Sequence, residues 1–410
     1  MKMKKFGLTI AMATLTLAAS AQSLNVNSAV GNLRKGYLNK AKAEIDAACL
    51  HEDTKEDPHT WQIKATVYAR IGEESKQKKS KYKDLAPDWA EQTYNALVEC
   101  KRLDTKQEYA KEVNQLFGVV GQDYFNRCLA AHDAQDFRTA MELGEKSSDC
   151  FTSAGMGQFA NQSLYYAGLG AYGLKDTANV KKYFNALSRK GTDYNFVYTT
   201  LFAYSKAENN PAEAMKVANL YVKNCKNDYR AYILSAQGYF LNNNLEKGKE
   251  MISQALNMTK DSANLYPVVL VAAAGMLDEN AQDYEGAEAK YKESLTLEPN
   301  QFGANMGMGR MYFNRGVDKN NAANAIDPFD EEKAGLYEKL SAESKELFGQ
   351  SIAYLEKAVA YIDGLETAQA KESQRVNLIN ALMALETAYV RVDMQDKSNE
   401  AKARREQLMK

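Results

Sequence analysis

The sequence is poor in the residues that build catalytic and metal sites. Its 410 residues include only three histidines, and it has no Cys-x-x-Cys, His-Glu-x-x-His or Gly-x-Ser-x-Gly pattern. These absences exclude zinc ribbons, thioredoxin-like redox sites, zincin proteases and nucleophile-elbow hydrolases. We therefore predict that the protein is not an enzyme and that it carries no cofactor or metal.

The histidines leave one metal hypothesis open. His51 and His59 flank an acidic loop, and two imidazoles with neighbouring carboxylates are a conceivable metal site. The loop is polar throughout, which favours a solvated connection between two helices instead. His132 stands in an Ala-His-Asp segment that fits a turn.

Proline is also scarce, and the net charge is close to zero. Only six prolines occur, which favours long helices, because a proline inside a helix removes a hydrogen bond and clashes with the preceding turn. The residues are 45% hydrophobic and 26% charged, as in a folded soluble protein. The formal net charge is -1, so we do not expect nucleic acid as a partner, since that usually needs a clustered basic surface.

The cysteines are odd in number. They are Cys49, Cys100, Cys128, Cys150 and Cys225. All except Cys128 fall near the expected end of a second helix of a pair. We interpret the five as small buried apolar residues. A set of disulfides, which an exported protein could form, is the alternative.

The N-terminus has the three parts of a secretory signal peptide. Residues 1–5 are basic, residues 6–18 are an apolar run, and residues 19–21 read Ala-Ser-Ala. A membrane anchor is less favoured, because the run is shorter than the about 20 residues that span a bilayer, and no later stretch is long enough. We predict that residues 1–21 are removed and that the protein is exported, periplasmic or outer-membrane associated, in a Gram-negative cell.

Small and large residues repeat with a period of 34 in the middle of the chain. The small or aliphatic members, which each follow a polar turn or linking segment, are Val180, Ala214 and Gly248. The larger members, sixteen positions earlier, are Leu164, Tyr198 and Tyr232. Each period therefore holds two helices.

This period resembles the tetratricopeptide repeat (TPR), whose helix pairs carry small and aromatic residues at set positions. The second helix that matches best, with its proline link, contains Tyr284, Ala287, Tyr291, Ser294 and Pro299. The resemblance is strong over residues 161–312 and weaker on either side. It implies an all-α, right-handed α-solenoid of about eight or nine stacked antiparallel helix pairs, a TPR-like superhelix. The export signal would make it an exported bacterial TPR protein.

Glycines inside the expected first helices are interpreted as packing positions. Gly168-Leu169-Gly170 and Gly307-Met308-Gly309 lack the preceding strand that a phosphate-binding loop needs. Small residues there let paired helices approach closely, and each pair leaves an apolar face that the next pair covers.

The domain organisation follows from the strength of the repeat. We expect a signal peptide (1–21), a divergent N-terminal TPR-like helical region (22–160), a regular TPR array (161–313), an insertion (314–344) and C-terminal TPR-like helices (345–410). In the insertion, Asp327-Pro328 favours a turn and Asp330 a helix cap. A second irregular segment, residues 72–88, is rich in lysine and is interpreted as a solvated loop, with a lysine-rich contact surface as the alternative.

The resemblance implies that partners bind the concave face, which first helices line. The residues that project into this groove are Tyr165, Tyr172, Thr199, Arg230, Gln237, Phe240, Arg310 and Asn314. We predict a non-catalytic scaffold of the cell envelope that binds a peptide or protein partner there, with no transmembrane segment after signal removal. The main alternative is a glycan- or nutrient-binding helical protein of the outer membrane. An enzyme with a site in residues 23–161 is the third hypothesis.

Overall fold

A computed structural model of the protein describes residues 24–327 and 331–409, and every regular element within these ranges is helical. The predicted all-α fold is confirmed. The described residues form two compact units, one ending at Thr192 and the other beginning at Asp193. This division falls inside the predicted regular array. The predicted signal peptide and the predicted turn and cap at Pro328 and Asp330 lie outside the described residues.

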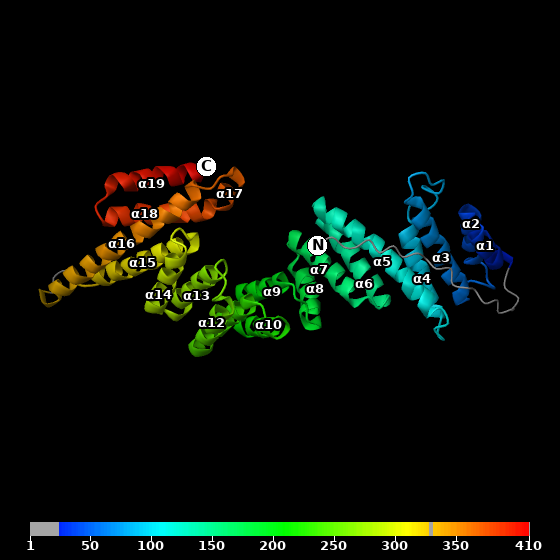
Figure 1. Ribbon diagram of the computed structural model, residues 1–410, viewed down its shortest axis with the longest axis horizontal. Coiled ribbons are helices and arrows are strands. Elements are labelled where there is room, and N and C mark those ends of the chain that lie inside the picture. Colours follow the sequence, from blue (N-terminus) through cyan, green and yellow to red (C-terminus); the bar gives the residue numbers. More distant parts are fainter. Residues whose placement is uncertain (1–23, 328–330, 410) are drawn as a thin grey trace. The chain divides into compact units, whose positions relative to one another are not determined.

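The N-terminal unit consists of four helix pairs (Figure 1). Its helices are α1 (Leu24–Arg34), α2 (Leu38–Ala48), α3 (Pro58–Ser75), α4 (Trp89–Leu103), α5 (Ala110–Asp133), α6 (Phe137–Ser153), α7 (Gly157–Gly173) and α8 (Thr177–Lys190). Consecutive helices pack side by side, which buries the apolar face that a single helix cannot cover.

The C-terminal unit, taken by itself, consists of five helix pairs and one short additional helix. Its helices are α9 (Asn195–Ala207), α10 (Pro211–Asn224), α11 (Tyr229–Leu241), α12 (Leu245–Thr259), α13 (Tyr266–Ala281), α14 (Tyr284–Leu297), α15 (Phe302–Asn324), α16 (Ala334–Asp363), α17 (Ala368–Ser373), α18 (Arg375–Arg391) and α19 (Gln395–Leu408). A short 3-10 helix, η1 (Glu331–Lys333), precedes α16. The described ranges thus hold nine pairs.

Polar caps explain why the turns recur. In five second helices, the N-cap side chain accepts a hydrogen bond from the backbone N–H three residues later, over 2.9–3.2 Å. These caps are Asp136, Asp176, Asn210, Asn244 and Asp283. Each satisfies an N–H that has no partner within its helix. The residue before each cap has a left-handed backbone, with φ between 50° and 60°, which ends the preceding helix.

Tyrosines on first helices connect successive pairs. Their hydroxyls donate over 2.7–2.8 Å to a carboxylate on the second helix of the preceding pair. The tyrosine–carboxylate pairs are Tyr68–Asp46, Tyr124–Glu91 and Tyr389–Glu356. A lysine also binds each carboxylate, over 2.8–3.0 Å. The rings themselves are buried, so one side chain both fills the interface and fixes its register.

Replacing Tyr124 with phenylalanine should lower the free energy of unfolding by about 1 kcal/mol near neutral pH, the usual net value of one such hydrogen bond. The Lys146 ammonium and the Tyr124 hydroxyl hold the pKa of Glu91 below its ordinary value of 4.5. A carboxyl whose pKa is lower in the folded state stabilises the fold above that ordinary value, and the contribution is lost as the pH falls through the folded value. Denaturation of both proteins at about pH 7 and about pH 3 should therefore show a difference that shrinks in acid. A difference that does not change with pH would contradict this contact.

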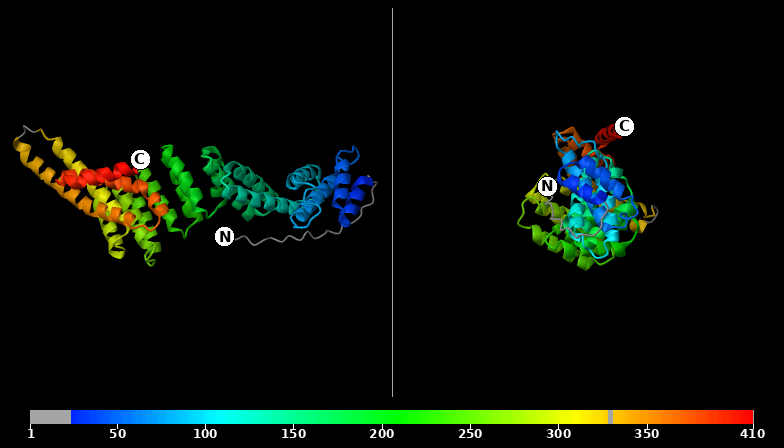
Figure 2. Two further views of the ribbon diagram at one scale, coloured as in Figure 1. Left: turned by 90° about the horizontal axis from the view of Figure 1, so that it is seen from above. Right: turned by 90° about the vertical axis from the view of Figure 1, so that its right-hand side faces the viewer.

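The predicted insertion, residues 314–344, coincides with the ends of two long helices. Among its described residues, α15 continues to Asn324, η1 follows, and α16, which is 30 residues long, begins at Ala334. The two helices form a long hairpin (Figures 1 and 2). The Ser344 hydroxyl donates to the Gly316 carbonyl over 2.8 Å, and a Cβ at Gly316 would lie 3.3 Å from Phe348. A small residue on α15 therefore lets α16 pack along it, and the pair is lengthened rather than interrupted.

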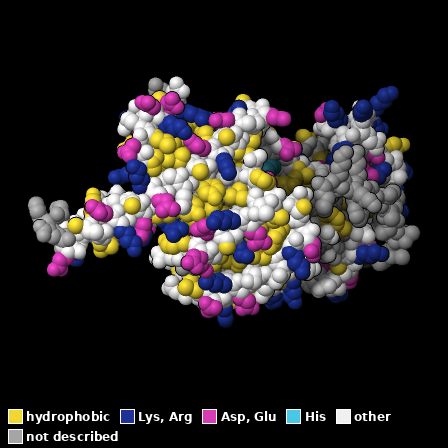
Figure 3. Space-filling view, turned by 60° about the vertical axis from the view of Figure 1, so that its left-hand side comes forward, with side chains coloured by type: hydrophobic (Ala, Val, Ile, Leu, Met, Phe, Trp, Pro, Cys, Tyr) yellow, Lys and Arg dark blue, Asp and Glu magenta, His cyan; other side chains and the backbone are white. Residues whose placement is uncertain are grey.

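The surface mixes charges of both signs. Acidic and basic side chains alternate around hydrophobic ones on the face that Figure 3 shows. Among the described residues, no helix combines the length and apolar character that crossing a membrane requires.

Candidate binding pocket

The eight residues predicted to line a groove all lie on first helices, as expected, but they differ in exposure. Two are on α7, one on α9, three on α11 and two on α15. The exposed members are Tyr172, Thr199, Arg230, Arg310 and Asn314. The half-buried members are Tyr165, which stacks on Phe184 at 6.2 Å between centroids, and Gln237. Arg230 forms an ion pair with Asp228 at 2.8 Å.

Phe240 is a core residue, contrary to the prediction. It is 4% exposed, and a Cβ at Gly248 would lie 2.4 Å from its ring. The ring therefore fills the space that the glycine leaves between α11 and α12. A side chain in this position cannot reach a ligand in a groove.

A pocket opens in the N-terminal unit where α3 to α7 meet, with a volume of about 160 Å³. We call it the Trp89 pocket. Its lining residues are Glu73, Lys76, Trp89, Gly118, Val119, Gln122, Asp123, Phe151, Met156 and Phe159. Most are apolar or aromatic, and the charged ones come from the last turn and cap of α3 and from α5. The pocket is therefore an apolar cavity with a polar rim, the usual character of a ligand site.

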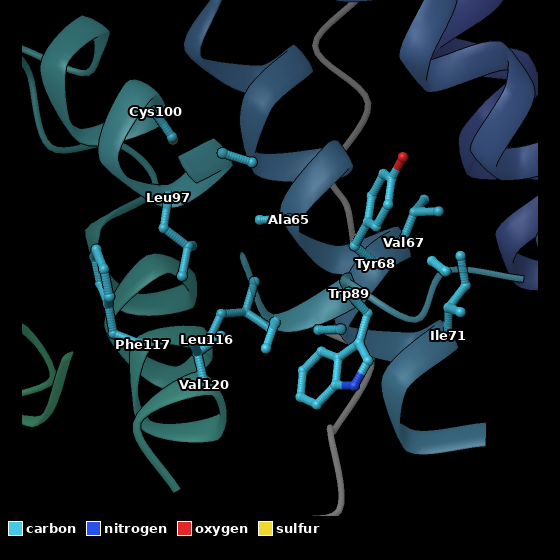
Figure 4. Close-up of a cluster of buried hydrophobic side chains, with 14 of the residues drawn as sticks. Ala65, Val67, Tyr68, Ile71, Trp89, Leu97, Cys100, Leu116, Phe117 and Val120 are labelled. Carbon is cyan, nitrogen blue, oxygen red and sulfur yellow. The ribbon is translucent and has the colours of Figure 1, made fainter. Parts of the chain in front are cut away.

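Trp89, the first residue of α4, gives the pocket one aromatic wall. Its side chain points toward the core beside Ile71 and Leu116 in Figure 4, and it is 7% exposed. A Cβ at Gly72 would lie 2.1 Å from the indole, so the ring packs directly on the α3 backbone. This packing fixes the orientation of the ring.

Another part of the lining combines two phenylalanines with a glycine of α5. The rings of Phe151 and Phe159 lie 5.4 Å apart between centroids. Gly118 lies in the middle of α5, and a Cβ there would meet the end of the Met156 side chain at 3.4 Å and the Ala154 Cβ at 3.9 Å. The absence of a side chain at Gly118 therefore keeps the cavity open.

An ion pair closes one edge of the pocket. The Lys76 ammonium lies 2.9 Å from an Asp123 carboxylate oxygen and 4.9 Å from the centroid of the Trp89 ring. The other Asp123 oxygen lies 3.9 Å from Arg127. Glu73, at the rim, is paired with Arg70 at 2.7 Å. The charges around the pocket are thus balanced within the chain.

A lysine-rich loop adjoins the pocket. Helix α3 extends to Ser75, and the segment between it and α4 carries five exposed lysines, Lys76, Lys78, Lys79, Lys81 and Lys83. The Tyr82 hydroxyl donates to the Gly36 carbonyl over 2.6 Å, and Tyr82 and Leu85 pack against the core. The loop is therefore held in place while its lysines face solvent.

His51 and His59, the residues of the metal hypothesis, have different surroundings. The described residues contain no group of three or more histidine, cysteine, aspartate or glutamate side chains that could hold a metal. His51 is exposed and lies 3.7 Å from Asp53, whereas His59 is buried in α3 and stacks on Tyr109 at 5.5 Å. Burial lowers the pKa of His59. The Trp89 pocket, by contrast, has a mostly apolar lining that is suited to an apolar group.

Four cysteines are buried, namely Cys49, Cys100, Cys128 and Cys150, and Cys225 at the end of α10 is half-buried. Burial raises the pKa of the Cys49 thiol to about 11 and those of the other three buried thiols to about 12. Since the thiolate is the reactive form, these four should alkylate slowly in the folded protein. Iodoacetamide at about pH 8 followed by peptide mass spectrometry should label Cys225 first. Rapid labelling of Cys100 or Cys128 before unfolding would contradict this packing.

The Trp89 pocket was not anticipated from the sequence. Two signals point to it in retrospect: Gly72 and Gly118 stand inside helices without a turn to require them, and the lysine-rich segment begins at the same edge. A glycine inside a helix costs about 0.5–1 kcal/mol, so it usually has a packing or functional reason.

No protein-family model and no curated protein matches the chain. Among solved structures it is similar to yeast Tom70, with 13% identity over 94% of this chain and 95% of that one and a TM-score of 0.35. It is also similar to a human IFIT1 dimer with m7Gppp-AAAA, with 14% identity, coverage of 95% and 91%, and a TM-score of 0.30. Likenesses this remote define no function, and the TPR-like assignment rests on the helix pairs themselves.

Proposed function

We propose that the protein is a non-catalytic binding scaffold of the cell envelope, which holds a peptide or protein partner by taking one of its apolar side chains into the Trp89 pocket. The observation that carries this proposal is the pocket itself: a cavity of about 160 Å³, lined by aromatic rings and a bare glycine, with its charged rim already neutralised. Interfaces draw most of their energy from a few buried anchors of this kind.

In the N-terminal unit, the exposed groove residue Tyr172 is a proposed further contact. The exposed groove residues of the C-terminal unit, namely Thr199, Arg230, Arg310 and Asn314, are proposed as contacts of that unit by itself. Glycan binding has less support, because the α3 backbone at Gly72 packs against the Trp89 indole and the Lys76 ammonium lies 4.9 Å from the ring centroid, so the ring is partly covered.

Affinity capture from envelope extract tests the binding function. The bait proteins are the wild type, Gly118→Leu, which places a side chain in the pocket, and Gly349→Leu as the matched control. Gly349 also lies inside a helix, but a Cβ there would meet nothing within 4 Å. We expect a partner with the wild type and the control and its loss with Gly118→Leu. A partner captured equally by all three would place binding elsewhere, and no partner from any bait would overturn the scaffold.

Export to the envelope is a separate part of the proposal. It rests on the basic, apolar and small-residue segments of residues 1–21. Cell fractionation of the full chain and of a chain that lacks residues 2–21 should place only the first in the envelope fraction. Equal distribution of the two proteins would contradict export.

A further inference from the structure

We propose, on the basis of the binding function above, that the partner segment carries an aromatic side chain flanked by carboxylates: the ring enters the Trp89 pocket, and the carboxylates pair with the lysines of the α3–α4 loop. The size and lining of the cavity point to an aromatic ring. The paired charges at its rim argue against a cation, and the lysines of the loop argue for carboxylates.

The cavity has the size of a single ring. Its volume of about 160 Å³ is close to the roughly 150 Å³ of an engineered protein cavity that binds benzene. Phe151, Phe159 and Met156 line it, and aromatic edges and thioethers both make favourable contacts with an aromatic ring. A phenylalanine side chain therefore matches both the volume and the chemistry of the walls.

The rim excludes a cation as the main ligand. Asp123 is the most buried carboxylate of the pocket, with a side chain 12% exposed, and it already binds Lys76 at 2.9 Å and approaches Arg127 at 3.9 Å. Glu73 is engaged by Arg70 at 2.7 Å. No uncompensated negative charge is left among these residues to attract an ammonium or guanidinium group.

The loop supplies a local positive charge in a chain whose net charge is only -1. Within the described residues, Lys78, Lys79 and Lys83 take part in no ion pair, and Lys81 lies 4.9 Å from the centroid of the Tyr82 ring. The hydrogen bond from Tyr82 to Gly36 holds in place the loop that carries these ammonium groups, and the loop begins at the pocket residue Lys76. Complementary charge at the rim of an interface steers encounter and selects the partner, so the flanks of the anchor should be acidic.

Fluorescence of Trp89 provides a direct assay. Trp61 and Trp89 are the two tryptophans of the chain, so in Trp61→Phe the emission reports the pocket alone. Trp61 is half-buried, and its indole N–H donates to the Lys55 carbonyl over 2.7 Å; circular dichroism checks that the variant is folded. Calorimetry with the unaltered chain gives the same ranking of ligands independently of the Trp61 change.

The probes are nine-residue peptides with a central phenylalanine between aspartates. One control peptide has alanine in place of the phenylalanine, and another has lysines in place of the aspartates. We expect a saturable change in Trp89 emission with the first peptide and at least tenfold weaker binding of both controls. Adding Gly118→Leu to the Trp61→Phe variant should also weaken binding of the first peptide at least tenfold. Equal affinity for the phenylalanine and alanine peptides, or for the aspartate and lysine peptides, would overturn the proposal.

The lysines are tested with a matched pair of variants. Replacing Lys78, Lys79, Lys81 and Lys83 with glutamine should weaken binding about tenfold and flatten its salt dependence, since surface charge pairs are screened by salt. The control replaces four other exposed lysines of the same unit with glutamine, namely Lys35, Lys101, Lys106 and Lys111, and should bind as the parent does. An oligonucleotide of equal charge that binds as tightly as the peptide would mean a general polyanion surface and would also overturn the proposal.

The two proposals fail in different ways. If Gly118→Leu abolishes capture of the envelope partner while the aspartate–phenylalanine peptide leaves Trp89 emission unchanged, the ligand class is wrong and the scaffold function stands. If Gly118→Leu leaves capture unchanged, the pocket is not the binding site, whatever the peptides do.

Discussion

Gly170→Ala is expected to lower the free energy of unfolding of the N-terminal unit by about 2–3 kcal/mol, the upper range for overpacking a filled interface. A Cβ at Gly170 would lie 2.8 Å from both the Met141 backbone nitrogen and the Phe137 carbonyl oxygen. These are backbone atoms of α6, so no side chain can rotate away, and α6 and α7 must separate. The gain of about 0.5–1 kcal/mol that alanine usually brings to a helix is too small to offset this.

Urea denaturation followed by tryptophan emission measures this effect, because Trp61 and Trp89 both lie in the N-terminal unit. Gly118→Ala is the matched control: it is also a change inside a helix of the same unit, but its Cβ would make ordinary contacts with the flexible end of Met156 at 3.4 Å and with the Ala154 Cβ at 3.9 Å. The control should be neutral or stabilise by up to about 1 kcal/mol. If the two variants have equal stability, α6 and α7 do not pack as closely as the structure has them.

Phe184→Ala should cost about 3–5 kcal/mol, the usual range for removing a fully buried phenylalanine. Phe184 in α8 is completely buried, and a Cβ at Gly168 in α7 would lie 2.2 Å from its ring. The ring therefore lies directly on the α7 backbone, and its loss leaves a cavity between the two helices of one pair.

A double-mutant cycle isolates this contact. Gly168→Ala alone should destabilise the unit, because the new methyl group collides with the ring. In the double variant the methyl group enters the space that Phe184 vacates, so the combined loss should be smaller than the sum by about 1–2 kcal/mol. Strict additivity would show that the two residues are not in contact. The cycle is measured by the same urea titration.

Periodicity predicted the helical fold well because it records burial directly. The 34-residue spacing of Val180, Ala214 and Gly248 corresponds to buried positions on α8, α10 and α12. The glycines of the first helices, read from sequence as packing positions, do lie where a Cβ would strike a neighbouring helix. These features are local to one pair and its neighbour, so a repeat reveals them.

The exposed surface was harder to predict because exposure depends on the opposite helix. Phe240 was placed in a groove by its register on α11, yet Gly248 on α12 leaves a space that only a large side chain fills. The sequence around residues 314–344 departs from the repeat, yet α15 and α16 both extend into it, because departure from a repeat does not end a helix.

The Trp89 pocket could not be found from periodicity at all. It is formed where Gly72 admits the Trp89 indole from α4 and where Gly118 and Phe151 both line the cavity, and these residues come from four helices. Only the three-dimensional packing brings them together. The sequence identifies the lysine-rich segment, with a contact surface as one interpretation. It does not predict the cavity that would hold an anchoring side chain.

The affinity of the captured envelope partner for three forms of the protein tests the binding function most directly. Isothermal titration calorimetry should be carried out with the wild type, Gly118→Leu and Gly349→Leu, each shown by circular dichroism and urea denaturation to be folded. We expect Gly118→Leu to bind at least tenfold more weakly, because its side chain occupies the cavity, and Gly349→Leu to bind like the wild type. Equal affinity of all three proteins would contradict a partner held in the Trp89 pocket.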